Sequence, residues 1–531
     1  MNSFTSAIRR TFALRSSDRF LPVLLFLPII AVYLLLLSSN WKTTWDSATY
    51  IMLGKSLISG RGYRYMDIPH TKYPFMFPLM LSPIIGLFGR NFLLMRLLIV
   101  LMALGSIILT FWLFRRYFDT WLGLGLMFMT AASYPLMYEC TRILSDIPYM
   151  FLSLLSLIFI HRYSRAEAWS SKSGYISAVL ILASFLTRYI GLALFASSLV
   201  YLLLDSKGSV SLRLRKIALI SVIFLVPASL WMVRGVVLRK THPPPPGLRE
   251  FLSYEKELVI VNPSDPHSNT ARLGDLIARI LNNSRYYQDM STDIVSGKDV
   301  NSIRRMWIVL VILLIGYIYC LARWRGVLEY YVFFYILTYI VWTSLQGVRF
   351  LVPVIPFIFY YLVRAFWLIP DVLNFLVRKR SADRWTREKY WLLGKRIILA
   401  ALVVALIYCN WSSDVNIIRA ERQKPYYTGD IANFLNAVEW VKENTEPDAV
   451  IVSGRSPWVY LLSDRRTFSP PWVENAEEVM ASIRGNHADY AIDSPALYSA
   501  RFLAPALKET PESFLKVYEM GDCTVYKVMG M

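Results

Sequence analysis

The stretch 92–114, FLLMRLLIVLMALGSIILTFWLF, decides the fold class of this chain. Its 23 residues contain a single charge, Arg96. As a helix they would extend about 35 Å, enough to cross the roughly 30 Å of hydrocarbon in a bilayer. Arg115 and Arg116 follow directly, as is typical of the cytoplasmic end of a spanning helix. We therefore interpret 92–114 as a transmembrane helix.

Apolar stretches of similar character recur along the chain. They lie at about 21–39, 120–137, 147–162, 174–187, 190–204, 217–237, 306–322, 327–345, 350–369 and 397–411. The total is eleven spans, within a range of nine to thirteen, because the two stretches beside Arg188 are short. The first stretch lacks a signal-peptidase site and is interpreted as a retained helix. The sequence thus predicts an all-α polytopic membrane protein.

The overall composition agrees with this class. The 531 residues are 55% hydrophobic and 18% charged, with a mean hydropathy of +0.41. Soluble domains are about 45–50% apolar and about 25% charged, so a soluble globular enzyme is excluded. The four cysteines, Cys140, Cys320, Cys409 and Cys523, are scattered and form neither a zinc motif nor a disulfide framework.

The net charge of +20 is explained by Lys and Arg residues in the loops between the spans. Loops that alternate to one side carry most of these cations, which predicts a cytoplasmic N-terminus and no nucleic-acid partner. The cations on this side are Arg9, Arg10, Arg15 and Arg19; Arg115 and Arg116; Arg162, Arg165 and Lys172; Lys207, Arg213, Arg215 and Lys216; Arg323 and Arg325; and the run 378–396.

Two domains are expected from this topology. Residues 1–411 form the membrane domain, and its larger outer loops are 40–91, 138–146 and 238–305. The last loop contains the run Pro243–Pro246, which favours a stiff spacer. Residues 412–531 are predicted to form a small extracytoplasmic α/β domain. Its expected helices lie at about 431–441 and 474–483, and its strands at 449–452, 489–492, 514–518 and 524–528.

Two acidic residues stand at expected helix starts in the outer loops. Asp46 begins a helix whose apolar face includes Tyr50 and Leu53, and Asp146 precedes Pro148 at the start of a span. Each could cap its helix through the free backbone amides, or serve as a carboxylate in an external site, with Asp46 as general base. Glu139 is a spare candidate for the same role, but is interpreted first as a solvated loop residue.

Three cations complete the set of outer charges: Lys72, Arg188 and Arg349. Any one of them could extend toward lipid headgroups, but three beside two acids favour an anionic ligand, since arginine holds phosphate through two hydrogen bonds. Nucleotide donors are absent outside the cytoplasm. An activated donor on this side must therefore arrive on a lipid, which suggests a sugar linked to polyprenyl phosphate.

Several short motifs resemble the GT-C superfamily of membrane glycosyltransferases. The closest likeness is to the bacterial glycosyltransferase family 39 type, which includes relatives of protein O-mannosyltransferases and of the transferases that modify lipid A with aminoarabinose. The motifs are Asp46 with Tyr50; Gly60-x-Gly62-Tyr63; Lys72-Tyr73-Pro74; Phe77-Pro78-Leu79; Phe88-Gly89-Arg90-Asn91 before Arg96-Leu97; Ser145-Asp146-Ile147-Pro148; and Arg349-Phe350-Leu351-x-Pro353-x-x-Pro356.

The resemblance implies a catalytic base at Asp46, supported by Asp146. Lys72, Arg349, Arg188, Tyr50 and Tyr73 are expected to bind the lipid phosphate or the donor. Many relatives carry Asp-Glu where this chain has Asp46-Ser47, so a metal-binding acidic pair is missing and we expect no metal and no cofactor. The usual Lys-Pro-Pro is Lys72-Tyr73-Pro74 here, a departure that weakens the implied role of Lys72.

The expected function is inverting transfer of a sugar from a polyprenyl-phosphate donor to an acceptor hydroxyl at the outer face of a bacterial inner membrane. The acceptor could be a glycan, a lipid or a protein. Two alternatives stay open. One is an O-antigen ligase or polymerase that uses diphosphate-linked glycans, and the other is a transporter of lipid-linked sugars. A transporter would place polar groups at mid-bilayer and often shows an inverted repeat.

Overall fold

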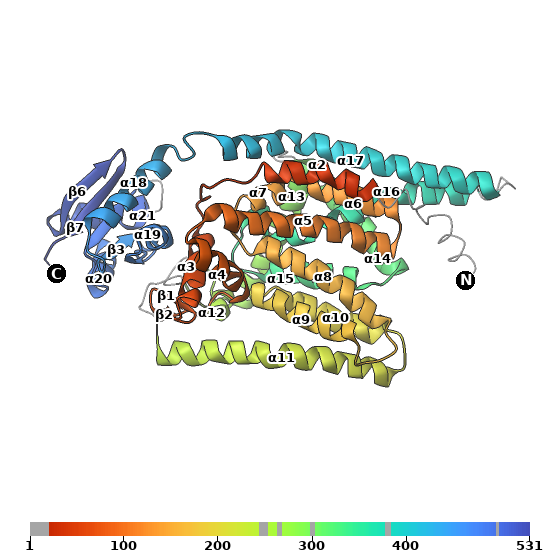
Figure 1. Cartoon of the computed structure of the whole chain (residues 1–531), viewed down its shortest axis with the longest axis horizontal. Coiled ribbons are helices and arrows are strands. Elements are labelled where there is room, and N and C mark those ends of the chain that lie inside the picture. Colours follow the sequence, from red (N-terminus) through yellow and green to blue (C-terminus); the bar gives the residue numbers. More distant parts are fainter. Residues whose placement is uncertain are drawn as a thin grey trace.

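The computed structural model describes residues 21–243, 253–262, 268–297, 303–377, 384–494 and 499–530. Long helices lie side by side in a bundle, and a small α/β unit stands at one end of it (Figure 1). Three predicted features fall wholly or partly outside the described residues. These are the tail with Arg9, Arg10, Arg15 and Arg19, the run Pro243–Pro246, and the start of the basic run 378–396.

Every predicted span coincides with a helix. The bundle helices are α2 (Leu21–Leu34), α5 (Phe92–Tyr117), α6 (Thr120–Ala131), α8 (Asp146–Ser164), α9 (Lys172–Thr187), α10 (Gly191–Asp205), α11 (Val210–Thr241), α14 (Ile303–Arg323), α15 (Val327–Val341), α16 (Ile355–Val377) and α17 (Arg384–Arg422). Among the described residues, six helices are long and apolar enough to cross a membrane, and six apolar helices are shorter. The chain is therefore a helical membrane protein.

The predicted span 120–137 is wrong in one respect, because it is interrupted. Helix α6 ends at Ala131, and a separate helix α7 (Tyr134–Cys140) begins after Ser133. Pro135 stands in the first turn of α7. Proline is tolerated there but would break an uninterrupted helix, since it lacks the amide hydrogen that the preceding turn requires. Helix α7 thus extends into the expected outer turn 138–146 as far as Cys140.

Side-chain caps define the starts of several bundle helices. Asn91 accepts a hydrogen bond from the backbone N–H of Leu94 at 3.1 Å, and Asp119 accepts one from that of Leu122 at 2.9 Å. Each cap satisfies a backbone donor that has no partner within the helix. Just before Asn91, the chain turns at Gly89, whose φ of +64° is readily adopted by glycine.

Elements of the outer loops gather at the end of the bundle nearest the α/β unit (Figure 1). They are α3 (Trp45–Ile58), β1 (Arg64–Tyr65), β2 (Ile68–Pro69), α4 (Met76–Phe88) and α12 (Tyr254–Val259). The 3₁₀ helix η3 (Gly347–Val354) leads into α16, and α13 (Leu273–Ser296) packs against α15 and α14. The predicted helix after Asp46 is confirmed as α3. It is buried on nearly all sides, however, because α4 and the α/β unit both pack against it.

The C-terminal unit is an α/β layer with one mixed sheet in the order β4-β3-β5-β7-β6. Strands β3, β4 and β5 are parallel, whereas β7 is antiparallel to β5 and β6. All the predicted strands and both predicted helices of this region are present. The elements are α18 (Gly429–Asn444), β3 (Val450–Ser453), α19 (Ser456–Ser463), β4 (Arg466–Phe468), α20 (Ala476–Gly485), β5 (Tyr490–Asp493), α21 (Ser499–Phe502), α22 (Ala504–Glu509), η5 (Pro511–Ser513), β6 (Phe514–Met520) and β7 (Cys523–Val528).

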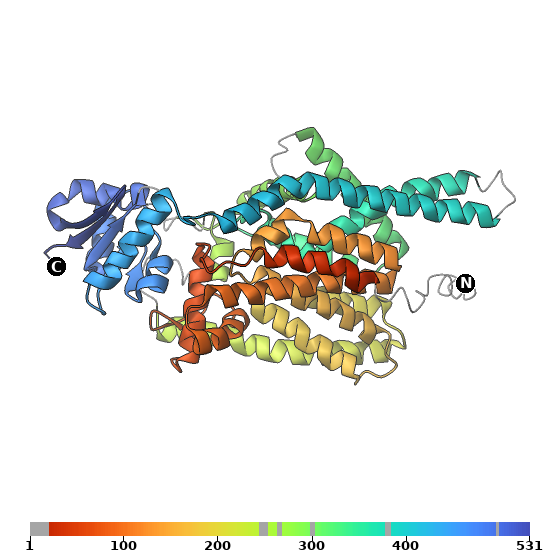
Figure 2. The same cartoon turned by 45° about the horizontal axis from the view of Figure 1, so that its top comes forward.

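The α/β unit contacts the first outer loop through α19. Lys55 of α3 forms an ion pair with Asp464 at 2.5 Å, and Arg90 donates to the carbonyl of Leu462 at 3.2 Å. The ring of Trp458 meets that of Trp41 edge-on at 5.7 Å. Helix α17 leads from the far end of the bundle toward this unit in both views (Figure 2).

A buried ion pair joins three bundle helices at the ends that lie nearest the α/β unit (Figure 1). Arg96 near the start of α5 pairs with Glu421 in the last turn of α17. The same guanidinium donates to the carbonyls of Leu36 and Asn40, which follow α2. Both charged side chains are almost wholly buried. Glu421 also pairs with Lys42 at 3.2 Å, so removing Glu421 would leave the buried Arg96 without a carboxylate partner in a site that excludes water.

We therefore expect Glu421→Gln to destabilise the fold by about 3–5 kcal/mol, measured as a lower midpoint of thermal unfolding in detergent. Glu474→Gln is the matched control, because Glu474 pairs with Arg501 at an exposed position and many surface pairs contribute nothing measurable. Equal midpoints for the two variants would contradict a structural role for the Arg96–Glu421 pair.

Candidate active site

Asp46 occupies the first turn of α3, as predicted. Its carboxylate accepts a hydrogen bond from the Tyr73 hydroxyl at 2.9 Å through Oδ1, and one from Arg349 Nη1 at 2.7 Å through Oδ2. Thr44, not Asp46, stands at the N-cap position of α3. The Asp46 carboxylate therefore contacts side chains of two other segments. It does not cap α3, so the interpretation of Asp46 as an N-cap is wrong.

Asp146 is the first residue of α8 and lies deeper in the same cluster. Its Oδ2 accepts a hydrogen bond from Arg349 Nε at 2.7 Å, and its Oδ1 pairs with Arg188 Nη1 at 2.7 Å. The side chain of Asp146 is 1% exposed, whereas that of Asp46 is 24% exposed. Of the two carboxylates, only Asp46 is accessible from outside.

Arg349 connects the two acids. It lies on η3, whose 3₁₀ turns direct the guanidinium between the start of α3 and the start of α8. Its Nη2 makes no hydrogen bond to any described residue, so one edge of the guanidinium can still donate to a ligand. Arg188 lies between α9 and α10 and donates to Ser145 Oγ at 3.1 Å. The four charged residues thus form one cluster.

Two tyrosines line the cluster. Tyr73 contacts Asp46 directly, and Tyr50 shares a 3.1 Å hydrogen bond with Ser145 Oγ. Their rings lie 5.0 Å apart, and Tyr50 also meets Phe77 edge-on at 5.1 Å. Residues from α3, the following loop and α4 therefore form an aromatic wall beside the carboxylates.

Lys72 does not contact the aspartates. Its Nζ donates to Glu257 Oε1 at 2.6 Å and lies 5.4 Å from the centre of the Tyr254 ring. Tyr254 in turn meets the rings of Tyr189 and Trp342. Glu257 and Tyr254 belong to α12, and sequence reasoning missed both. They stand in a long polar loop in which no spacing or apolar pattern distinguishes them from solvated residues.

The interpretation of Glu139 as a solvated loop residue is wrong. It lies on α7, and its side chain is buried beside the cluster. It pairs with Arg142 at 3.2 Å. Burial raises the pKa of Glu139, the nearby Asp146 carboxylate acts in the same direction, and the Arg142 guanidinium opposes both. The burial of Glu139 follows from the helix break at Pro135. Because α7 is a separate helix after this break, it packs into the protein and carries Glu139 with it.

Burial would by itself raise the pKa of Asp46. The charge and hydrogen bond of Arg349, together with the Tyr73 hydroxyl, outweigh burial and hold this pKa below its usual value. In the adjoining loop, burial lowers the pKa of His70 to about 3, and Lys72 and Arg234 act in the same direction. Asp46 is therefore ionised and His70 neutral at physiological pH.

The positive charge between the two aspartates is supplied by the protein. In the described parts of the chain, no group of three or more His, Cys, Asp or Glu side chains is arranged to hold a metal ion. The position where a cation could bridge Asp46 and Asp146 is taken by the guanidinium of Arg349, 2.7 Å from each.

Comparison with known proteins agrees with the resemblance predicted from the motifs. Residues 72–233 match the family described as dolichyl-phosphate-mannose-protein mannosyltransferase. No curated protein sequence matches the chain. The matched residues include Lys72, Tyr73, Asp146 and Arg188, but neither Asp46 nor Arg349.

Solved structures share the fold over nearly the whole chain. ArnT from Cupriavidus metallidurans bound to undecaprenyl phosphate superposes with a TM-score of 0.61 at 15% identity, covering 96% of this chain and 98% of that one. The oligosaccharyltransferase AglB from Archaeoglobus fulgidus, in complex with an inhibitory peptide and a dolichol-phosphate, gives a TM-score of 0.57 at 12% identity. That match covers 93% of this chain and 71% of AglB. The predicted resemblance to GT-C membrane glycosyltransferases is confirmed, and the fold is theirs.

Proposed function

We propose that this protein is an inverting glycosyltransferase. It transfers a sugar from a polyprenyl-phosphate-linked donor to an acceptor hydroxyl at the extracytoplasmic face of a bacterial inner membrane. The observation that carries the proposal is the contact of one guanidinium, Arg349, with both Asp46 and Asp146. This contact combines a phosphate-binding group with an accessible carboxylate at one end of a membrane bundle.

The charge balance of the site supports an anionic ligand that competes with a carboxylate. Asp46 and Asp146 are matched by Arg188 and Arg349, and Lys72 is matched by Glu257. A phosphate therefore binds most favourably where it takes over an arginine from an acid already present. Arg349 is the arginine best suited to this exchange, because its Nη2 is free and its partner Asp46 is partly exposed.

Donor binding then prepares the base. As the donor phosphate shares Arg349, the Asp46 carboxylate loses part of its counter-charge and becomes a better proton acceptor. Asp46 takes the proton of the acceptor hydroxyl, and the hydroxyl oxygen attacks the anomeric carbon. The bond from that carbon to the phosphate oxygen breaks, and its electron pair leaves with the polyprenyl phosphate. The guanidinium stabilises the leaving anion.

The accessibility of the acids supports inversion. A retaining mechanism by double displacement needs a carboxylate that can attack the anomeric carbon, in addition to the acid–base residue. Both oxygens of Asp146 are held at 2.7 Å by guanidinium groups, and this residue is buried. Asp46 alone is accessible, and one base gives a single displacement.

The rival functions fit these observations less well. The charged residues of the site lie near the ends of helices, with Asp46 in the first turn of α3 and Asp146 at the start of α8, and not at mid-bilayer where a transporter would bind its substrate. A diphosphate-linked donor would bring more negative charge than the free Nη2 of Arg349 can match, since the other cations of the site are already paired. The acceptor, whether glycan, lipid or protein, is proposed only as a hydroxyl compound.

We expect Asp46→Asn to reduce transfer at least 100-fold, in line with the 10²–10⁴-fold contribution of a general base. The amide is similar in size and can still accept the Tyr73 hydrogen bond, but it cannot accept a proton. The assay measures transfer of radiolabelled sugar from polyprenyl-phosphate donors by purified protein. Asp67→Asn is the control, because Asp67 is an exposed acid of the same outer loop. A similar rate for wild type and Asp46→Asn would overturn the assignment.

We expect Glu257→Gln to lower the KM for the donor severalfold with little change in kcat. The substitution frees Lys72 from its carboxylate partner, so that the ammonium can attract the donor phosphate. Glu255→Gln on the same helix is the matched control, because Glu255 is exposed. If Glu257→Gln and Lys72→Met both left KM unchanged, Lys72 would have no part in donor binding.

The pH dependence follows from the pKa of Asp46. A base must be ionised, and the pKa of this group lies below its usual value in the free protein. We therefore expect kcat/KM to be level from about pH 5 to pH 8, and to fall only below about pH 4. Because bound donor draws Arg349 away, the acid limb of kcat should lie at higher pH than that of kcat/KM. An acid limb of kcat/KM near pH 6.5 would point to a different base.

A further inference from the structure

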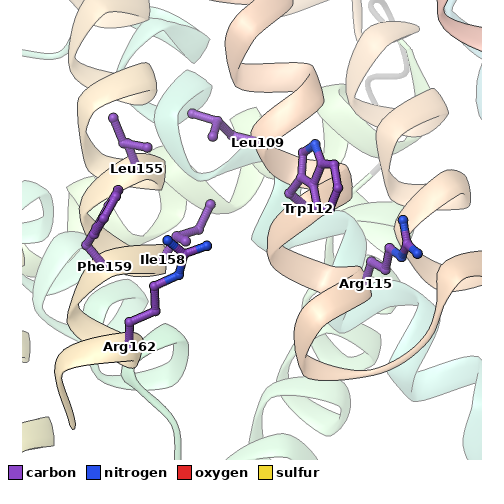
Figure 3. Close-up of a pocket in the computed structure, with 7 residues that line it drawn as sticks. All are labelled: Leu109, Trp112, Arg115, Leu155, Ile158, Phe159 and Arg162. Atoms are coloured by element: carbon purple, nitrogen blue, oxygen red, sulfur yellow. The ribbon is translucent and has the colours of Figure 1, made fainter. Parts of the chain in front are cut away.

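A groove of about 500 Å³ lies between α5 and α8, far from the candidate active site. Its volume falls within the range of small-molecule sites. Its walls are mostly apolar and aromatic, made by Leu109, Trp112, Leu155, Ile158 and Phe159. Arg115 of α5 and Arg162 of α8 complete the lining, one from each wall (Figure 3).

Neither arginine is paired with an acid. Among the described residues, Arg115 and Arg162 have no carboxylate within ion-pair distance. Their contacts are instead with rings of their own helices. Arg115 lies 5.4 Å from the centre of Trp112, and Arg162 lies 5.1 Å from that of Phe159. Both guanidinium groups therefore retain their donors and their unmatched charge for a ligand, whereas Arg188 and Arg349 are ion-paired with carboxylates.

The position of the groove indicates which lipid leaflet it faces. Arg162 lies in the last turn of α8, whereas Asp146 of the candidate active site begins that helix. Sixteen residues of helix separate them by about 24 Å. The two sites therefore lie near opposite membrane surfaces. The charge of the short loops predicts that Arg115 and Arg162 are at the cytoplasmic surface, where anionic lipids concentrate.

We propose that this groove is a binding site for an anionic glycerophospholipid of the cytoplasmic leaflet. The headgroup phosphate lies between Arg115 and Arg162, and an acyl chain follows the apolar wall from Phe159 toward Leu109 and Leu155. Charge complementarity selects an anion, and the apolar lining selects a lipid over a free anion. The polyprenyl donor is not the occupant, because its phosphate is required at the other surface.

The test measures the dissociation constant of fluorescent phosphatidylglycerol for the full-length protein in non-ionic detergent. Arg115→Gln/Arg162→Gln should weaken binding about 30-fold, since each basic group near a membrane surface contributes about 1 kcal/mol. The matched control is Lys207→Gln/Arg215→Gln. It removes two exposed cations that the same loop-charge rule places at the same surface, but that do not line the groove. Phosphatidylcholine should bind wild type no better than it binds the double variant.

A second variant separates a built site from diffuse charge attraction. Leu155→Trp keeps both arginines but fills the groove, so it should also weaken phosphatidylglycerol binding. Unchanged binding by Leu155→Trp, or an equal loss in the control pair, would overturn the proposal in favour of nonspecific attraction. Competition by inorganic phosphate alone, or stronger competition by polyprenyl phosphate than by phosphatidylglycerol, would also overturn it. None of these measurements depends on sugar transfer, so the proposed function stands or falls separately.

Discussion

The contact of Arg349 with two carboxylates is the interaction on which the site depends. It joins residues 46, 146 and 349, which three separate stretches of the chain bring to one end of the bundle. A guanidinium suits this position because it is planar, always charged and able to donate in several directions at once. Without it, Asp46 would lose its guanidinium partner and Asp146 would keep only Arg188, at a cost in uncompensated negative charge.

Charge neutrality in turn limits what the site can bind. Each acid of the cluster is already paired with a cation. The cluster therefore attracts a neutral ligand weakly, and an anionic ligand binds only by replacing one of the acids as the partner of a cation. In the proposed mechanism, exchange at Arg349 couples donor binding to catalysis, because the group released is Asp46, the more exposed of the two carboxylates. The low pKa of Asp46 in the free protein is compatible with this proposal, since loss of the Arg349 counter-charge would raise that pKa.

The sequence predicted the helical elements well, because hydropathy over about 20 residues reflects a strong physical requirement. It also located Asp46, Asp146, Arg188, Arg349, Tyr50 and Tyr73 in outer segments, and these six form one cluster. The ion pair of Lys72 was not predictable from the sequence. Its partner, Glu257, is 185 positions away in a loop without a regular pattern. The burial of Glu139 was missed for a local reason, since one proline divides an apolar stretch that otherwise resembles a continuous span.

The C-terminal α/β unit acts on the site through α3. This helix carries Asp46, and it is packed on one side by α4 and on another by α19. Lys55 of α3 and Arg90, just after α4, both form ion pairs with Asp464. A base must be held within a fraction of an ångström to act well, and helices fixed from two sides provide such rigidity better than free loops. We therefore propose that the unit helps to position α3.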